Sequence, residues 1–197
     1  MNLVDRAKNI ILKPKEEWEV IGAEEPNVGQ IMTGYVIPLA ILPAVAVIIG
    51  YGVVGFLGFR SFTYGIASGI ISLLVSIGGV YLTAFVVDAL AGSFNSQKNL
   101  GRAIQLVAYS YTPVWIGGIL NIFPALSWLG MLFGLYGLYL MYLGLPKTMQ
   151  TPEDKVVVYL IVSIIVLIVV YFILSAILTS ILFGIFGLSM LSAISGM

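Results

Sequence analysis

The stretch that decides the fold is residues 103–146, AIQLVAYSYTPVWIGGILNIFPALSWLGMLFGLYGLYLMYLGLP, in which 44 consecutive residues carry no charged side chain. As one straight helix it would extend about 66 Å, at about 1.5 Å per residue. The hydrocarbon core of a bilayer is only about 30 Å thick, so the stretch must fold back on itself. Asn121, with Pro124 three residues later, is the natural turn. The stretch therefore predicts two membrane spans, at 103–120 and 125–145.

Three other charge-free runs, of 34, 27 and 42 residues, exceed the length of about 20 apolar residues that a span needs. They predict spans at 30–59, 62–87 and 156–183. The whole chain is 60% hydrophobic and 9% charged, with a mean hydropathy of +1.07. It is therefore predicted to be all-α, a polytopic integral membrane helix bundle with five spans. Residues 184–197 are too short for another span and predict an interfacial or disordered tail, and a six-span arrangement is the alternative.

The N-terminal residues 1–29 differ from the rest, because ten charges fall within the first 25 residues. They predict a cytoplasmic amphipathic segment ahead of a membrane domain at 30–197. Asn2 is a suitable N-cap for a first helix, since its side chain accepts a hydrogen bond from a free backbone N–H. The apolar residues of that helix fall on one stripe, which we expect to face lipid. They are Leu3, Ala7, Ile10 and Ile11.

A second short helix is predicted to begin at Pro14, because proline is well suited to the first helical turn. Trp18 lies on its apolar side, and tryptophan favours the boundary between lipid and water. Together with Lys13 and Lys15, it is predicted to anchor the segment at the membrane surface.

The basic residues predict the orientation of the chain, because cytoplasmic loops of membrane proteins are enriched in Lys and Arg. With five spans and a cytoplasmic N-terminus, eight of the nine basic residues lie inside and only Arg60 lies outside. The reverse orientation would invert this bias. The C-terminus is therefore predicted to be external.

Small residues predict how the spans pack, because helices in lipid associate through close backbone approach and interhelical hydrogen bonds. Two glycine pairs at a spacing of four residues and one serine stripe mark such faces. They are Gly65 and Gly69, Gly130 and Gly134, and Ser68, Ser72 and Ser76. We expect these faces to pack within the monomer.

The composition also excludes several kinds of function. A net charge of zero gives no electrostatic footprint for nucleic acid. Without a single Cys or His, the chain lacks thiol nucleophiles, His-based acid–base catalysis and the usual zinc and haem ligands. The sequence therefore predicts no enzyme, no cofactor and no metal site.

Asp88 is the acidic residue that borders long apolar runs from within the membrane domain. An ionisable residue at membrane depth is by default a candidate for a proton or ion path. However, Asp88 is expected at the cytoplasmic end of the second span, where water can reach it. Two interpretations stay open. Asp88 is either structural, as the cap of a neighbouring helix or the partner of Arg102 or Lys98, or it is a functional group.

The third span contains a candidate functional kink at Pro113. Proline donates no backbone hydrogen bond, so the carbonyl of Tyr109 would lose its partner four residues on. A free carbonyl at membrane depth needs another helix, a water or a ligand. The candidate functional cleft combines this kink with nearby polar residues, while an aromatic belt with ordinary packing is the alternative. Its residues are Asp88, Tyr109, Tyr111, Pro113, Asn121, Tyr136, Tyr139 and Tyr142.

Several of these segments resemble a known family. They are LVAYSYTPVW at 106–115, IFPA at 122–125, LYGLYLMYLGLPK at 135–147, TPEDK at 151–155 and PKEEW at 14–18. Together they resemble the Yip family (Ypt/Rab-interacting membrane proteins), most closely its prokaryotic branch. The resemblance covers nearly the whole chain and implies five spans, a cytoplasmic N-terminus and a place in the inner membrane of a prokaryote. Binding of Rab-type GTPases is not carried over, because this chain lacks the long cytoplasmic domain and acidic motifs of the eukaryotic relatives.

Two functions from different classes remain as hypotheses. The first is a non-enzymatic protein that organises membrane lipids, binds other membrane proteins or forms a homo-oligomer. Glycine-rich spans, an amphipathic N-terminus and the near absence of charge within the spans favour it. The second is a small transporter or channel that uses the cleft near Asp88, Pro113 and the tyrosines.

Overall fold

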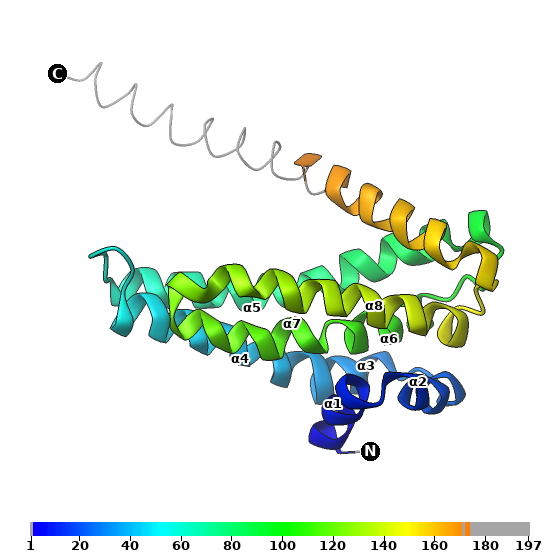
Figure 1. Cartoon of the computed structure of the whole chain (residues 1–197), viewed down its shortest axis with the longest axis horizontal. Coiled ribbons are helices and arrows are strands. Elements are labelled where there is room, and N and C mark those ends of the chain that lie inside the picture. Colours follow the sequence, from blue (N-terminus) through cyan, green and yellow to red (C-terminus); the bar gives the residue numbers. More distant parts are fainter. Residues whose placement is uncertain (1, 171, 174–197) are drawn as a thin grey trace. The chain divides into compact units, whose positions relative to one another are not determined.

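The computed structural model describes residues 2–170, 172 and 173 of the chain. Their regular structure is helical, apart from an isolated bridge between Phe56 and Phe59. Among these residues, four helical segments are long and apolar enough to cross a membrane (Figure 1). They are Val28–Val54, Phe62–Phe94, Leu100–Ile122 and Pro124–Thr148. The all-α fold is thus confirmed, and four of the predicted spans have counterparts.

The fifth predicted span, 156–183, lies partly outside the described residues. Residues 156–170 are helical, and the rest of this span, with the predicted tail at 184–197, falls outside the described chain apart from residues 172 and 173. The chain divides into two compact units, Met1–Leu160 and Ile161–Met197. The five-span count therefore stays a prediction.

The first span is a helix with a wider turn near each end. It contains α3 (Val28–Ile31), a π-helical turn η1 (Met32–Val36), α4 (Ile37–Ile49) and a second π-helical turn η2 (Gly50–Val54). The η1 turn precedes Pro38, whose ring would clash with the carbonyl of Gly34 in a regular α-helix. Single π turns are frequent at functional sites.

The second span, α5 (Phe62–Leu90) continued by η3 (Ala91–Phe94), packs closely against α4. A Cβ atom added to Gly69 would lie 2.8 Å from the Ala44 carbonyl oxygen, and one added to Gly65 would lie 2.9 Å from the Ile48 carbonyl oxygen. The prediction that this glycine pair packs within the monomer is confirmed. Gly130 and Gly134 show no such close approach, because an added Cβ at either meets no atom of the described chain within 4 Å.

The third and fourth spans form the predicted hairpin. The third consists of α6 (Leu100–Ser110), α7 (Thr112–Gly117) and η4 (Gly118–Ile122), with a break between α6 and α7 just before Pro113. The fourth consists of η5 (Pro124–Leu129) and α8 (Gly130–Thr148), so the chain reverses between Asn121 and Pro124 as predicted. Gly137 allows α8 to approach α6, because a Cβ there would lie 2.9 Å from the carbonyl oxygen of Ser110.

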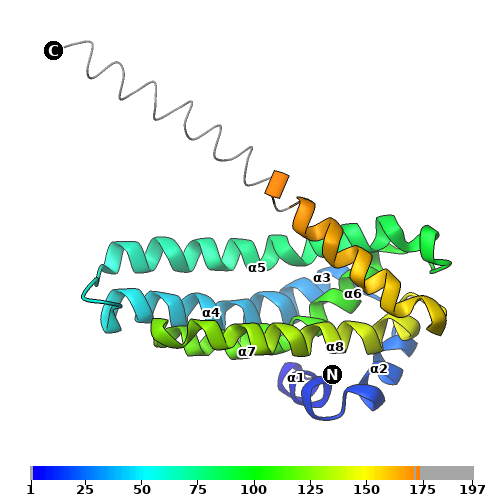
Figure 2. The same cartoon turned by 45° about the horizontal axis from the view of Figure 1, so that its top comes forward.

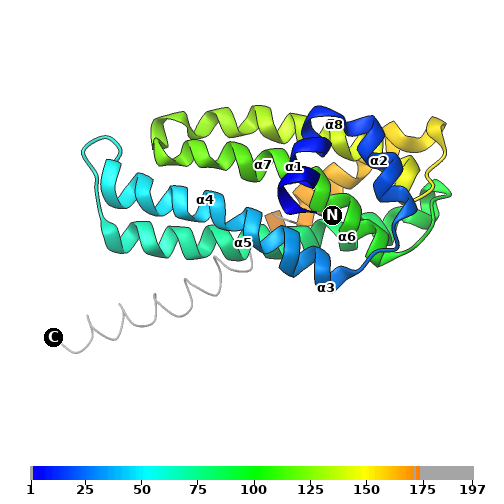
Figure 3. The ribbon, with the colours of Figure 1, turned by 90° about the horizontal axis from the view of Figure 1, so that it is seen from below.

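The N-terminal helix pair, α1 (Leu3–Leu12) and α2 (Pro14–Ala23), packs against the bundle beside α6 and α8 (Figures 2 and 3). Asn2 caps α1 as predicted, accepting a hydrogen bond from the backbone of Val4 at 3.1 Å. Ala7 and Ile10, expected to face lipid, are buried in the protein core instead. The apolar stripe of α1 therefore belongs to a protein interface within this chain.

Large apolar side chains point outward along the spans, where a soluble protein would carry polar ones. On α5 and α8 these include Ile70, Ile71, Leu74, Val75, Met131, Leu132 and Leu135. Extended exposed apolar surfaces mark contact with a membrane or a partner.

Two loops are held together by hydrogen bonds at the end of the bundle near α2. Ser96 donates to Oγ1 of Thr151 at 2.9 Å, and the Gln97 backbone donates to the Met149 carbonyl at 2.7 Å.

Candidate functional site

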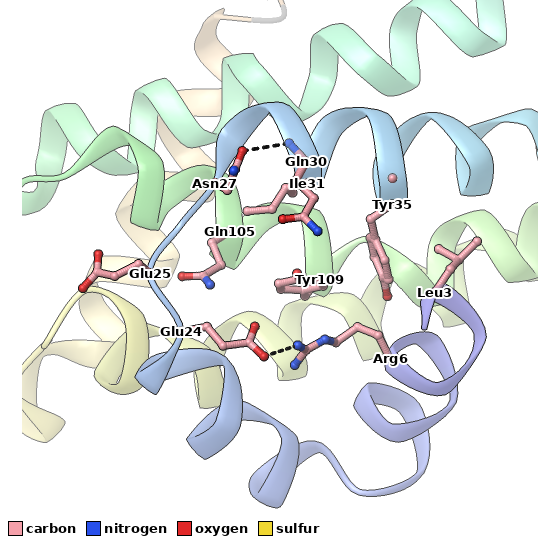
Figure 4. Close-up of a pocket in the computed structure, with 11 residues that line it drawn as sticks. Leu3, Arg6, Glu24, Glu25, Asn27, Gln30, Ile31, Tyr35, Gln105 and Tyr109 are labelled. Atoms are coloured by element: carbon pink, nitrogen blue, oxygen red, sulfur yellow. Dashed lines mark hydrogen bonds and ion pairs between the residues drawn. The ribbon is translucent and has the colours of Figure 1, made fainter. Parts of the chain in front are cut away.

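A cavity of about 380 Å³ lies between the N-terminal helix pair and the bundle (Figure 4). We call it the N-terminal cavity. Its wall combines α1, the loop before α3, the first turns of the first span and α6. The residues that line it are Leu3, Arg6, Glu24, Glu25, Asn27, Gln30, Ile31, Gly34, Tyr35, Gln105 and Tyr109. The η1 turn contributes both Gly34 and Tyr35 to this wall.

Arg6 is the centre of the ion pairs at this cavity. Its side chain is only 6% exposed, and Nη1 donates to Oε1 of Glu17 at 2.8 Å while Nη2 donates to Oε1 of Glu24 at 2.5 Å. Burial by itself would lower the pKa of Arg6, but the hydrogen bond with Glu24 and the surrounding acidic groups raise that pKa above its usual value. Arg6 therefore stays charged, and its two carboxylate partners offset the cost of burying that charge.

Arg102 joins the end of α2 to α6. Its Nη1 donates to the carbonyl oxygens of Gly22 at 3.2 Å and Glu24 at 2.6 Å, and to Oε1 of Gln105 at 3.2 Å. A cation is favourable beside the last carbonyls of a helix, where the helix dipole is negative. Gln105, 1% exposed, in turn donates to the Ile21 carbonyl at 3.3 Å. The α2–α3 loop is therefore held against the third span by two polar side chains of α6.

The kink predicted at Pro113 is present, and the carbonyl that proline leaves free has a partner within the chain. Oγ1 of Thr112 donates to the Tyr109 carbonyl at 2.7 Å. The hydroxyl of Tyr35 lies 2.7 Å from the same Oγ1. Because Thr112 has a single hydroxyl hydrogen, Tyr35 must be the donor of that second bond. The free carbonyl therefore binds protein, not a ligand.

Trp18, predicted to anchor the N-terminal segment at the membrane surface, is fully buried. Its indole fills the space left by Gly144, where an added Cβ would lie 2.7 Å from the Trp18 ring and 2.5 Å from Leu106. The predicted anchors Lys13 and Lys15 are exposed. Arg6 is the signal in the sequence that could have predicted this burial. It places a charge on the same helical stripe as Leu3 and Ile10, and such a stripe is better suited to packing against protein than against lipid.

Asp88 is half-buried on α5, away from the N-terminal cavity. Arg102 forms its contacts with the α2–α3 region, so its predicted pairing with Asp88 is wrong. Lys98 forms no ion pair with Asp88 either, within the described part of the chain. Oδ1 of Asp88 is buried and receives no hydrogen bond from a described residue. The neighbouring Tyr159 donates to the Val87 carbonyl and stacks on Phe94.

The residues of the predicted cleft do not form one site. Tyr109 lines the N-terminal cavity, whereas Tyr111 pairs with Thr83 at 2.7 Å. Tyr136 donates to the Ile11 carbonyl of α1 at 2.6 Å. Tyr139 and Tyr142 are each 41% exposed on the outer face of α8.

Asn121 lines a second cavity of about 260 Å³, which we call the outer cavity. The first four spans all contribute to its wall, with Pro43, Ser72, Ser76 and Trp115 among the lining residues. Two of these serines belong to the polar stripe found in the sequence. No group of three or more His, Cys, Asp or Glu side chains in the described chain is placed to hold a metal ion.

The chain is similar in sequence to known membrane proteins. A family model described as the Yip1 domain matches residues 8–177. The inner membrane protein YohC of Escherichia coli strain K12 is 26% identical over 153 residues, which cover 72% of this chain and 77% of the relative. The protein of the same name from Escherichia coli O6:H1 matches equally well. No solved structure matches the chain.

Proposed function

Since the chain belongs to the Yip1-domain family of membrane proteins, we propose that it is a non-enzymatic inner-membrane protein that organises the membrane around it. It does so by binding lipid or a partner membrane protein at the end of the bundle that carries the N-terminal helix pair. Its similarity to an inner membrane protein supports this location.

The observation that carries this proposal is the N-terminal cavity itself. Its polar wall is held in place by two arginines. Arg6 joins α1 to α2 and to the loop after it, and Arg102 joins that region to the third span. A concave site with a few convergent polar groups is the usual form of a binding site. The described residues around it offer no nucleophile paired with a general base, so binding without chemistry is the simplest use.

In the proposed orientation, the helix pair and the loops around Ser96 and Thr151 are cytoplasmic. The distribution of Lys and Arg supports this, since Arg60 is the one basic residue at the opposite end. With the fifth span at 156–183, the C-terminus is external. The N-terminal cavity then lies at the level of the cytoplasmic headgroups, where lipid can reach it from the side.

A variant that fills the cavity tests the proposal. Gly34 lines the cavity, and an added Cβ there meets no atom within 4 Å, so Gly34→Leu inserts a side chain without a direct clash. Gly78→Leu is the matched control, because Gly78 is equally open but lies on α5 outside the cavity. The full chain is extracted from cells in a lipid-retaining polymer, and the retained lipids are compared by mass spectrometry with those of the bulk membrane.

We expect enrichment of one lipid class for the wild type and for Gly78→Leu, and loss of that enrichment for Gly34→Leu. A partner membrane protein that is retained by the wild type and lost in Gly34→Leu supports partner binding. If the wild type retains lipids in the proportions of the bulk membrane and no such partner, the proposal is refuted.

Transport is the second candidate function, and the outer cavity favours it. Ser72 and Ser76 bring hydroxyl groups into this cavity at the depth of the spans, where polar groups are costly unless they have partners. Ser76→Cys, in a chain that has no native cysteine, provides the test. Labelling of the introduced thiol by a small charged reagent from both sides of sealed vesicles supports a path across the membrane, and labelling from neither side refutes it.

A further inference from the structure

We propose that the N-terminal cavity binds a primary ammonium group, carried either by an ethanolamine-type lipid headgroup or by a free amine. This inference rests on the proposed binding role of the cavity and names the chemistry of its ligand. It follows from the charges, the free hydrogen-bonding atoms and the aromatic rings of the wall.

The charges around the cavity favour a cation. The carboxylates of Glu17, Glu24 and Glu25 outnumber the two guanidinium groups of Arg6 and Arg102, which leaves one net negative charge. Both terminal nitrogens of Arg6 already donate to carboxylates at 2.8 and 2.5 Å. An anion such as phosphate would have to displace Glu24 from Arg6, so the cavity is poorly suited to it.

The cavity offers free acceptor atoms to a ligand, beside the side-chain N–H groups of Asn27 and Gln30. One oxygen of Glu24 accepts from Arg6, while the other receives no hydrogen bond from a described residue, and this side chain is 41% exposed. Gln30 also lines the cavity, and its exposed side-chain amide has both an acceptor oxygen and N–H donors. A primary ammonium donates three hydrogen bonds and accepts none, so the free carboxylate oxygen of Glu24 is its charged acceptor and the amide oxygen of Gln30 a second one.

Tyr109 contributes a second polar group to which a ligand can bind. This residue is 7% exposed, and its hydroxyl forms no hydrogen bond with any residue of the described chain. The hydroxyl stays accessible from the cavity, so it can donate a hydrogen bond to a ligand or accept one from it. Figure 4 shows Tyr109 between Arg6 and Ile31, close to Glu24.

The aromatic rings of the wall argue against a quaternary ammonium. Such a cation donates no hydrogen bond and is usually held against open aromatic faces. The face of Tyr109 is taken by Arg6, whose Cζ lies 5.3 Å from the ring centre. Tyr35 packs edge-on against the same ring, with 4.8 Å between centroids. A metal ion is disfavoured as well, because the described residues offer no cluster of three carboxylates.

Native mass spectrometry of the purified full-length protein in detergent tests this inference. The protein is mixed with equal amounts of phosphatidylethanolamine and phosphatidylcholine that have the same acyl chains, and the lipids that stay bound are compared. We expect the wild type to prefer the ethanolamine lipid. Glu24→Gln is expected to reduce this preference about tenfold, or by about 1.4 kcal/mol, because the ammonium loses a charged hydrogen-bond acceptor. Tyr109→Phe removes only the hydroxyl and keeps the ring against Arg6, so it reports on the ligand even if Glu24→Gln disturbs the fold.

The matched control is Glu16→Gln, which removes an exposed carboxylate of α2 outside the cavity and is expected to keep the preference. Ethanolamine and choline, added separately to lipid-free protein in a thermal shift assay, distinguish the two sources of the ammonium. Stabilisation by free ethanolamine supports a small amine, and binding of the lipid alone supports a headgroup.

Equal retention of both lipids together with no shift by ethanolamine would overturn the inference. So would a preference that Glu24→Gln and Tyr109→Phe leave unchanged. If Gly34→Leu still abolished the retention of some other lipid, the proposed binding function would stand and only the ammonium assignment would fail.

Discussion

The guanidinium group of Arg6 lies over the ring of Tyr109, with its Cζ 5.3 Å from the ring centre. This contact joins the first helix of the chain to the third span, across more than a hundred residues of sequence. A cation above an aromatic ring is attracted by the ring quadrupole, and the attraction is stronger away from water. The N-terminal helix pair is thus part of the folded bundle, held by charge as well as by apolar packing.

Arg6→Met is expected to destabilise the protein by about 3–5 kcal/mol, because it leaves the carboxylate of Glu17 buried without its partner. A thermal melt in detergent measures the effect. Lys8→Met, at an exposed position of the same helix, is the control and should melt like the wild type. Adding Glu17→Gln to Arg6→Met should recover part of the loss, and a single variant that melts at the wild-type temperature would contradict the role of this pair.

Gly144→Ala is expected to loosen α2 from α8, because the added methyl would lie within 2.8 Å of Trp18 and Leu106. Overpacking of this kind costs about 1–3 kcal/mol, against a gain of at most about 1 kcal/mol in helix propensity. Gly134→Ala, on the same helix but with open space around it, should be neutral or slightly stabilising. Melting temperatures of the two variants should therefore move in different directions, and equal values would count against this packing.

Thr112→Val is expected to lower stability by about 1–3 kcal/mol, because the Tyr109 carbonyl and the Tyr35 hydroxyl both lose a partner away from water. Thr112→Ser keeps the hydroxyl and should behave like the wild type. Thr63→Val, at an exposed position of α5, controls for the loss of a hydroxyl elsewhere. A stable Thr112→Val protein would show that the bonds at the Pro113 kink contribute little.

The orientation of the chain can be measured by cysteine labelling, because the sequence contains no cysteine of its own. Exposed positions at the two ends of the bundle are Ala125 in η5, and Ser93 and Asp154 in the loops near the N-terminal helix pair. We expect a membrane-impermeant maleimide to label Ala125→Cys in intact cells, and Ser93→Cys and Asp154→Cys only after lysis. The opposite pattern would reverse the proposed topology.

The spans can be predicted from the sequence because hydrocarbon excludes charge so strongly. The turn at Asn121 and Pro124 and the break before Pro113 both lie where local rules place them. The start of the third span is predicted less accurately. The sequence predicts it at residue 103, after the charge of Arg102, but α6 begins at Leu100 because Asn99 caps it. The charge of Arg102 is accommodated by carbonyl groups of the α2–α3 region, which are remote in sequence.

The candidate site is harder to predict, because its contacts join segments that are far apart along the chain. The sequence singles out Tyr109 for its carbonyl, whereas the structure places its ring in the N-terminal cavity. In the sequence, Arg6, Glu17 and Glu24 resemble the surface charges of an amphipathic segment. Their pairing depends on how α1 and α2 fold against each other and against α6, which a helical periodicity cannot specify.

The packing of Trp18 on Gly144 has a consequence for biosynthesis. The two residues are 126 positions apart, and a ribosome adding about 5–20 residues per second separates their synthesis by about 6–25 seconds. The backbone carbonyl of Ile11 likewise gains its hydrogen bond only after Tyr136, whose hydroxyl donates to it, has been synthesised. The packing of the helices made first is therefore completed late, and a ribosome stalled before residue 144 would leave α2 without the part of its surface that Gly144 of α8 provides.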